Sequence, residues 1–158
     1  MLEIRATTGA DWEVLKAVRL AALLDAPTAF GVLYASAAGY TDAQWRERAS
    51  SGRFLLAFMD GGPAGIVGGV VSPASEFNLI AMWVAPAYRG TAVAAGFVEA
   101  IKARAISQGH ARVVLDVSPC NVRAAAFYRK LDFASLPEWE TLESHPDIKV
   151  QKMVWNGS

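Results

Sequence analysis

The chain of 158 residues is 53% hydrophobic and 19% charged, and its 15 basic and 15 acidic side chains cancel to a net charge of zero. This composition excludes a disordered chain and a broad basic surface for nucleic acid, while the length fits one domain, residues 1–158, with a full hydrophobic core. A single cysteine excludes an internal disulfide and no apolar run is long enough to cross a bilayer, so we expect a soluble cytoplasmic protein.

The first part of the chain predicts a strand followed by two helices. Apolar and polar side chains alternate from Leu2 to Thr7, and apolar residues then follow helical spacing from Asp11 to Leu24. Thr28 to Tyr40 has no clean period, which indicates a loop or a broken helical turn. The sequence Thr41-Asp-Ala-Gln44 resembles a capping box, so a short helix is expected to begin there.

The middle of the chain predicts three successive antiparallel strands. Phe54 to Met59 and Ala64 to Val71 flank the turn residues Asp60-Gly-Gly-Pro63, which is typical of a hairpin. Ser72 to Glu76 then turns the chain into a third strand, Phe77 to Val84. The second strand contains glycines that weaken it and indicate a bulge or the close approach of another segment: Gly65, Gly68 and Gly69.

The remaining elements alternate helices with strands. A long helix ends near Gly109, and the almost entirely apolar stretch from Arg112 to Val117 predicts a central strand covered on both faces. The last elements are a helix, a short strand, an irregular stretch and a final strand: Asn121 to Leu131, near Phe133, Trp139 to Pro146, and Ile148 to Trp155. This order predicts an α/β or α+β fold with a mixed sheet. It excludes a doubly wound dinucleotide fold, because the candidate phosphate turn follows the fourth strand.

The candidate phosphate turn lies where the strand ending at Val84 leads through Pro86, Arg89 and Gly90 into the long helix. The first N–H groups of such a helix have no partner inside the helix, and the helix dipole adds about half a positive charge there. This turn can therefore hold a phosphate or pyrophosphate. Turns of small residues before helices are common, so the turn alone does not decide the ligand.

Two segments resemble motifs of the GNAT superfamily of N-acetyltransferases. Arg89-Gly-Thr-Ala-Val-Ala94 is similar to the acyl-CoA motif Arg/Gln-x-x-Gly-x-Gly/Ala. Asn121-Val-Arg-Ala-Ala-Ala-Phe127-Tyr128, continuing to Phe133, is similar to the family's helix with Asn, Phe-Tyr and Gly-Phe. The order of the predicted elements is also similar to the GNAT fold over essentially the whole chain. The resemblance implies a mixed, mostly antiparallel central sheet of about six to seven strands flanked by about four helices.

The resemblance also implies transfer of an acetyl group from acetyl-CoA to a primary amine of a small molecule or peptide, by direct attack in a ternary complex and without a metal ion. Tyr128 would be the general acid that protonates the leaving thiolate, and Glu76 a candidate base for the amine. Family members commonly pair, so a homodimer is one expectation, whereas nucleic acid and membrane are not expected as partners. The cofactor would contact the strand edge, the turn and the second helix: Met82, Trp83, Val84, Arg89, Gly90, Thr91, Ala92, Val93, Ala94, Asn121 and Tyr128.

Each of these residues also has a structural interpretation. Tyr128 falls on a helical stripe with Leu131 and can belong to the core, and Asn121 is a good helix N-cap. Arg89 can be a solvated turn residue. Glu76 can be an exposed hairpin residue, in which case ordered water would take the proton of the amine.

Two departures from the family motif bear on activity. Ala92 stands where the middle glycine is usual, and its methyl group can crowd a backbone that approaches a pyrophosphate. Asp132 replaces the glycine before Phe133. These departures and the lack of a clear base keep a second hypothesis open, a non-catalytic acyl-CoA-binding or sensing protein on the same fold.

The acceptor site would lie between the first helices and the late loop. The side chains that can line it are aromatic or imidazole groups: Phe30, Tyr34, Trp45, Trp139 and His145. Such residues are more often part of a core, and the sequence does not identify the amine. Cys120 suggests a covalent acetyl-cysteine, but no histidine is spaced to activate it.

Overall fold

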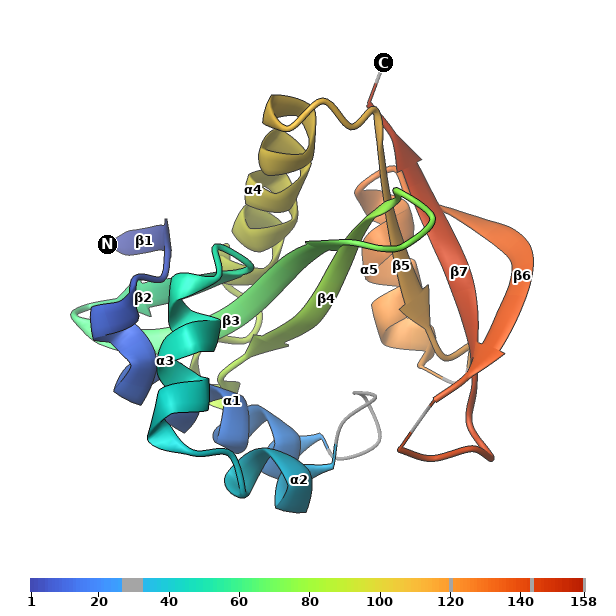
Figure 1. The fold of residues 1–158 in the computed structure, drawn as a ribbon. Helices are drawn as coiled ribbons and strands as arrows, with labels where there is room; N and C mark the ends of the chain where they lie inside the picture. The colour runs from blue at the N-terminus through green and yellow to red at the C-terminus, as the bar shows by residue number, and fades with distance from the viewer. Residues whose placement is uncertain (27–32, 120, 143, 158) are drawn as a thin grey trace.

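The computed structural model describes residues 1–26, 33–119, 121–142 and 144–157 (Figure 1). Seven strands form one sheet in the order β1-β2-β3-β4-β5-β7-β6. The strands are β1 Leu2–Ala6, β2 Phe54–Met59, β3 Gly62–Val71, β4 Phe77–Val84, β5 Arg112–Val117, β6 Ala134–Thr141 and β7 Lys149–Asn156. The helices are α1 Trp12–Asp25, α2 Tyr34–Ala38, α3 Asp42–Ser50, α4 Val93–Ser107 and α5 Val122–Lys130, with short 3₁₀ helices η1 Gly9–Asp11 and η2 Pro86–Tyr88.

The sheet is mixed, with one parallel pair at its centre. β4 and β5 run parallel, and every other neighbouring pair is antiparallel. The parallel pair follows from the connection, because α4 returns the chain to the edge at which β4 began. The prediction of a mixed, mostly antiparallel sheet is therefore confirmed. None of the described helices has the length and apolar character that a membrane span requires.

Helices cover both faces of the sheet, each over its own apolar cluster (Figure 1). The larger cluster joins Phe97 of α4 and Tyr128 of α5 to Phe77 of β4. The smaller cluster joins Leu15 of α1 and Trp45 of α3 to the opposite face of β2 and β3. Burial of one large apolar side chain contributes about 1.5–3 kcal/mol. The two clusters therefore fix the helices on either side of the sheet.

Two segments that the sequence left irregular contain regular structure. The described part of the stretch from Thr28 to Tyr40 contains α2, which agrees with the second of the two alternatives, a broken helical turn, and gives five helices among the described residues where about four were expected. Its five residues are too few to show a helical period. The stretch from Trp139 to Pro146 is irregular only in part, because β6 extends to Thr141. β6 pairs only with β7 and is almost wholly exposed, so burial imposes no apolar alternation on its sequence.

The glycines of β3 lie at a β-bulge and at a close approach of another strand, the two features that the sequence predicted for them. The register between β3 and β4 shifts between Ile66 and Gly68, which is a β-bulge. A Cβ atom on Gly65 would lie 2.4 Å from the carbonyl oxygen of Trp83, closer than two such atoms can approach. Ala81 of β4 has a φ of 57°, in the left-handed region. Both strands are therefore irregular where β3 contacts the second half of β4.

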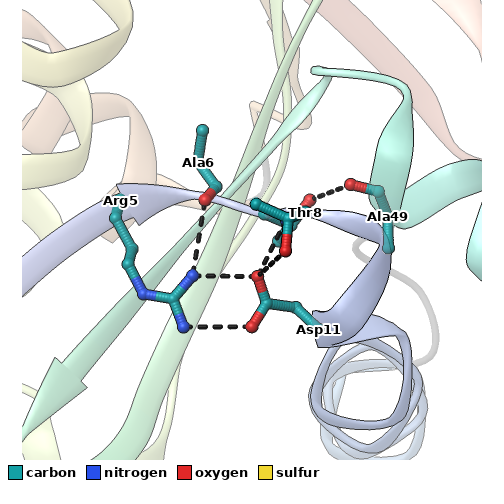
Figure 2. Close-up of polar contacts among 6 residues, drawn as sticks. Arg5, Ala6, Thr8, Asp11 and Ala49 are labelled. Atoms are coloured by element: carbon teal, nitrogen blue, oxygen red, sulfur yellow. Dashed lines mark hydrogen bonds and ion pairs between the residues drawn. The ribbon is translucent and has the colours of Figure 1, made fainter.

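A polar network ties the end of β1 to the start of α1 (Figure 2). Arg5 donates two hydrogen bonds to Asp11, from Nη1 to Oδ2 at 2.8 Å and from Nη2 to Oδ1 at 3.0 Å. The N–H of Thr8 donates to Oδ2 at 2.8 Å, and Thr7 Oγ1 donates to the carbonyl of Ala49 at 2.7 Å. The donors of Arg5 and Thr8 lower the pKa of Asp11 to about 2, with Arg5 contributing most. The network sets the direction in which α1 leaves the sheet.

We expect Asp11→Asn to lower the free energy of unfolding by about 1–2 kcal/mol at pH 7, because a bidentate charged pair is lost. The folded pKa of Asp11 lies below its unfolded value. The contribution of the Asp11 carboxylate to the free energy of unfolding is therefore complete above about pH 4 and is lost as the pH falls toward about 2. Urea unfolding of both proteins at pH 7 and pH 3 measures the difference.

The matched control is Asp60→Asn, which removes an exposed ion pair with the N-terminus of Met1. Exposed pairs contribute little, so this control is expected to cost less than about 0.5 kcal/mol. If Asp60→Asn lowers the free energy of unfolding as much as Asp11→Asn does, the proposed contribution of the Arg5–Asp11 pair is contradicted. It is also contradicted if the loss caused by Asp11→Asn is as large at pH 3 as at pH 7.

Candidate active site

The candidate site is built where β4 and β5 stop pairing, and the name crevice is used here for the region between the unpaired backbone segments of the two strands. The two strands pair at only two consecutive positions, ending at Asn78 and Val114, and then diverge (Figure 1). β4 continues to Val84 and β5 to Val117, so their backbone groups have no strand partner across the crevice. An extended ligand can add to such an edge as another strand. The crevice also lies at the carboxyl ends of two parallel strands, where open sheets commonly bind ligands.

The β4–α4 turn, residues 89–92, leads from the crevice into α4. Gly90 has a φ of 79°, which glycine adopts without strain. α4 begins without a side-chain cap and without an acidic residue in its first turn. Thr91 Oγ1 accepts from the N–H of Val93 at 3.4 Å, and no described residue accepts from the N–H groups of Ala94 and Ala95. Free donors at the positive end of a helix dipole fit an anion such as pyrophosphate.

The guanidinium of Arg89 is engaged by protein groups. Its Nε donates to the carbonyl of Val84 at 3.0 Å, and its Nη2 donates to Oδ2 of Asp25, the last residue of α1. The same Oδ2 accepts from Trp83 Nε1 at 2.9 Å. These donors lower the pKa of Asp25, with Trp83 contributing most. Asp25 therefore joins α1 to the end of β4 and to the β4–α4 turn, and Arg89 holds the turn in place.

Tyr128 lies in the core, on the side of α5 that faces the sheet. Its side chain is 8% exposed and packs edge-to-face on Phe127 and Phe133, with ring centroids 5.3 and 5.7 Å away. Burial raises the pKa of Tyr128, so its hydroxyl keeps its proton throughout the neutral range. The core interpretation is thus confirmed. A buried phenol that stays protonated also meets the requirement for a general acid, a role that stays a prediction.

Lys102 of α4 fixes the C-terminal end of α5. Its side chain is buried, and its Nζ donates to the carbonyl of Leu131 at 2.7 Å. The same Nζ lies 5.6 Å from the ring centroid of Phe133 and 4.9 Å from that of Trp155. A buried ammonium group needs such a hydrogen bond and such aromatic faces to offset the loss of water. These contacts hold α5, and with it Tyr128, against α4.

Asn121 and Glu76 both have structural partners. Asn121 Oδ1 accepts from the N–H of Ala124 at 3.2 Å, so the N-cap interpretation is confirmed and a contact with a cofactor stays a prediction. Glu76 accepts from Arg112 Nη2 at 3.1 Å and from Lys152 Nζ at 3.0 Å. It therefore lies at the closed end of the crevice, where β4 and β5 still pair, away from the β4–α4 turn.

The candidate acceptor side chains have different environments. Trp45 is 1% exposed and belongs to the core cluster beneath α1 and α3, so of its two interpretations the core is confirmed and the pocket is not. Tyr34 on α2 and Trp139 on β6 are exposed, and His145 Nδ1 lies 2.9 Å from Oγ of Ser144. Two further predictions concern residues outside the described part of the chain, Phe30 and Cys120.

Two residues beside the crevice, Asp25 and Asp116, were not predicted from the sequence. The partners of Asp25 are 58 and 64 residues away in the chain, so no local pattern could indicate them. Asp116 did carry a signal, because a carboxylate does not fit a strand that is covered on both faces. Asp116 is exposed, so β5 is not covered on both faces at its C-terminal end, contrary to the prediction.

The structure brings most of the predicted site residues around the crevice. Met82 and Val84 pack against the cluster that contains Tyr128, and Trp83 packs against the cluster on the opposite face. The unpaired strand edge and the free helix N–H groups therefore belong to consecutive segments, and the protonated phenol of Tyr128 lies in the core cluster that Met82 and Val84 border. This arrangement can bind a ligand with an anionic end and an amide-bearing arm, and it has a proton donor in the adjoining core.

Comparison with known proteins finds the same fold in solved structures. Solved structures similar to the chain include the acetyltransferase of GNAT family from Streptococcus pneumoniae, with a TM-score of 0.77 and 22% identity over 100% of both chains. The ribosomal-protein-alanine N-acetyltransferase from Brucella melitensis has a TM-score of 0.75 and 17% identity, covering 98% of this chain and 99% of that chain. RimL, a ribosomal alpha-N-protein acetyltransferase solved in complex with coenzyme A, has a TM-score of 0.77 and 15% identity over 98% of this chain and 93% of that chain.

At sequence identities of 15–22%, the similarity to these solved structures establishes the fold of the chain. Comparison with curated protein sequences gave no match. The model of the acetyltransferase (GNAT) family matches residues 20–133, which is more than half of the chain and includes α4, the crevice and α5. The chain therefore belongs to the GNAT acetyltransferase family.

Proposed function

We propose that the protein transfers an acetyl group from acetyl-CoA to a primary amine. The observation that carries this proposal is the crevice, with the uncapped start of α4 at its end and Tyr128 in the adjoining core. Coenzyme A has a pyrophosphate and an amide-bearing pantetheine arm, which match the free helix N–H groups and the unpaired edge of β4. Two of the similar structures are named as protein N-acetyltransferases, and one of them contains coenzyme A.

The residues of the chain have separate tasks in this reaction. The N–H groups of Ala94 and Ala95 hold the pyrophosphate, and the β4 edge near Trp83 orients the pantetheine arm as if it were a strand. Bound acetyl-CoA supplies a thioester, whose carbonyl carbon the amine attacks directly. As the C–N bond forms and the C–S bond breaks, the hydroxyl of Tyr128, which is protonated throughout the neutral range, donates its proton to the leaving sulfur, and the proton lost by the attacking nitrogen restores the phenol.

Calorimetric titration with acetyl-CoA and CoA, followed by measurement of amine-dependent thiol release, tests this proposal. Binding with thiol release that depends on an added amine is expected. Binding without release across a broad panel of amines and peptides would instead support a non-catalytic acyl-CoA-binding protein. Absence of binding by both ligands would contradict the assignment of the crevice.

We expect Ala92→Gly to tighten acetyl-CoA binding about two- to fivefold, equivalent to about 0.5–1 kcal/mol. Ala92 is the N-cap of α4 and has φ −75° and ψ −1°, which alanine adopts without strain. Its methyl group therefore acts only through the space that it takes beside the pyrophosphate. Titration of both proteins with acetyl-CoA measures the change, with Ala100→Gly in the middle of α4 as the control for loss of helix propensity. Unchanged or weaker binding by Ala92→Gly would show that the methyl group does not crowd the cofactor.

A further inference from the structure

Asp25 joins the last turn of α1 to two parts of the cofactor site at once. Its Oδ2 accepts a hydrogen bond from Trp83 Nε1 at 2.9 Å and another from Arg89 Nη2. Trp83 lies in the part of β4 that has no partner on β5, and Arg89 begins the β4–α4 turn. Both segments carry proposed contacts with acetyl-CoA. Asp25 itself belongs to α1, which covers the opposite face of the sheet from α4.

The β4–α4 turn contains backbone donors that can bind an anion only if the turn is fixed. Gly90 has a φ of 79°, and no described residue accepts from the N–H groups of Gly90 and Ala92. Free N–H groups on neighbouring residues of a turn form a concave anion site. Arg89 holds this turn, because its Nε donates back to the carbonyl of Val84 at 3.0 Å while Asp25 holds its Nη2.

The contact of Asp25 with Arg89 adds little to the stability of the fold. The two side chains are 33% and 51% exposed, and ion pairs with such exposure contribute little. α1 is already fixed by Leu15 and Leu23, each 1% exposed in the cluster beneath it. The contact therefore provides position: it sets where Trp83 and Arg89 lie relative to α1.

We propose that Asp25 is a positioning residue for the cofactor site, which holds the β4–α4 turn and the β4 edge at Trp83 in the conformation that binds acetyl-CoA. This inference rests on the proposed function, because that function assigns acetyl-CoA to the site. Coupling between two sites is reciprocal, so a contact that strengthens cofactor binding is strengthened by the bound cofactor to the same degree. Binding of acetyl-CoA therefore also stabilises the C-terminal end of α1.

The binding test compares wild type, Asp25→Ala and Asp11→Asn by calorimetric titration with acetyl-CoA and with CoA. Asp25→Ala removes the acceptor of Trp83 and Arg89 and is expected to raise the Kd of both ligands about five- to tenfold. Asp11→Asn is the matched control, because it breaks the pair with Arg5 at the other end of α1. It is expected to leave both Kd values within about twofold of wild type. Tighter binding by Asp25→Ala would show that Asp25 competes with the pyrophosphate for Arg89, which overturns the proposal.

Amide hydrogen exchange separates positioning from a general loss of structure. In wild type, saturating CoA is expected to slow exchange in the last turn of α1, where the N–H of Ala26 donates to the carbonyl of Ala22 at 3.0 Å. Because the coupling is reciprocal, the slowing is expected to be about five- to tenfold. It is expected to disappear in Asp25→Ala and to persist in Asp11→Asn. Slowing at the start of α4 is expected in all three proteins.

The outcomes separate the two levels of the proposal. If wild type binds neither acetyl-CoA nor CoA, the proposed function fails and this inference fails with it. If wild type binds, but Asp25→Ala has the same Kd and the same CoA-dependent slowing in α1, only the role of Asp25 is overturned. If Asp25→Ala does not fold, Asp25→Asn takes its place, since it loses the charge but keeps an oxygen that can accept from Trp83. A rise in Kd of at least about twofold is then expected, and an unchanged Kd overturns the role of Asp25.

Discussion

Replacing Tyr128 by Phe is expected to lower the rate of acetyl transfer about 100-fold while changing acetyl-CoA affinity less than about twofold. The ring of Tyr128 packs on Phe127 and Phe133, and phenylalanine keeps those contacts. Only the hydroxyl is lost, and with it the proton for the leaving thiolate. Because burial raises the pKa of Tyr128, the hydroxyl is protonated at every pH at which the enzyme is assayed, so the loss is expected to be the same from pH 6 to pH 9.

Steady-state turnover, calorimetric binding of acetyl-CoA and thermal unfolding together check this result. Tyr40→Phe is the matched control, since Tyr40 contacts Trp45 in the other cluster and its hydroxyl has no place in the proposed reaction. Unchanged turnover in Tyr128→Phe would assign the hydroxyl to the core alone. A large fall in stability would show instead that the hydroxyl supports the fold.

Gly65→Ala is expected to lower the free energy of unfolding by about 3 kcal/mol or more. The new Cβ would lie 2.4 Å from the carbonyl oxygen of Trp83, 3.0 Å from Cε2 of Phe97 and 3.3 Å from Cα of Val84. Two of these atoms belong to the backbone of β4, which cannot move aside as a side-chain tip can. β4 would have to shift away from β3 and toward the crevice.

Urea unfolding measures the loss, and titration with acetyl-CoA shows whether the shifted edge of β4 still binds. Gly62→Ala is the control in the same strand, because its Cβ would meet only the carbonyl oxygen of Met59 at 3.9 Å. It is expected to change the free energy of unfolding by less than about 1 kcal/mol. Because Gly→Ala by itself lowers the entropy of the unfolded chain and stabilises the fold, equal losses in the two variants would show that the cost does not come from the contact with β4.

The sequence predicted those parts of the fold that depend on residues close together in the chain. The capping box at α3 is an example: Gln44 N–H donates to Thr41 Oγ1 at 3.2 Å, and Thr41 N–H donates to Gln44 Oε1 at 2.9 Å. The alternation that predicted β1 follows in the same way from one buried face. By contrast α2 is short and β6 is an exposed edge strand, so neither has the burial that would impose a pattern.

The candidate site was predictable where it consists of one continuous segment. The β4–α4 turn and the helix with Tyr128 are such segments, and their motifs were sufficient to place them. The side-chain contacts of the site join residues far apart in the chain: Arg89 and Asp25 are separated by 64 positions, and Glu76 and Lys152 by 76. No periodicity or short motif encodes such pairs. The contact of Arg89 with Asp25 and the position of Glu76 at the closed end of the crevice could therefore be found only from the structure.

Under the proposed function, the divergence of β4 and β5 also makes the stability of this protein depend on the concentration of acetyl-CoA. The sheet leaves a length of inner strand edge without a strand partner among the described residues, so part of its hydrogen bonding is left to water or to a ligand. A ligand that binds only the folded chain stabilises it by mass action, by about 2.7 kcal/mol at a concentration 100 times its dissociation constant. Under the proposed function, acetyl-CoA in the cell thus sets the population of unfolded chain as well as the rate of the reaction. Depletion of acetyl-CoA would slow the enzyme and, in the same step, expose more of it to proteolysis.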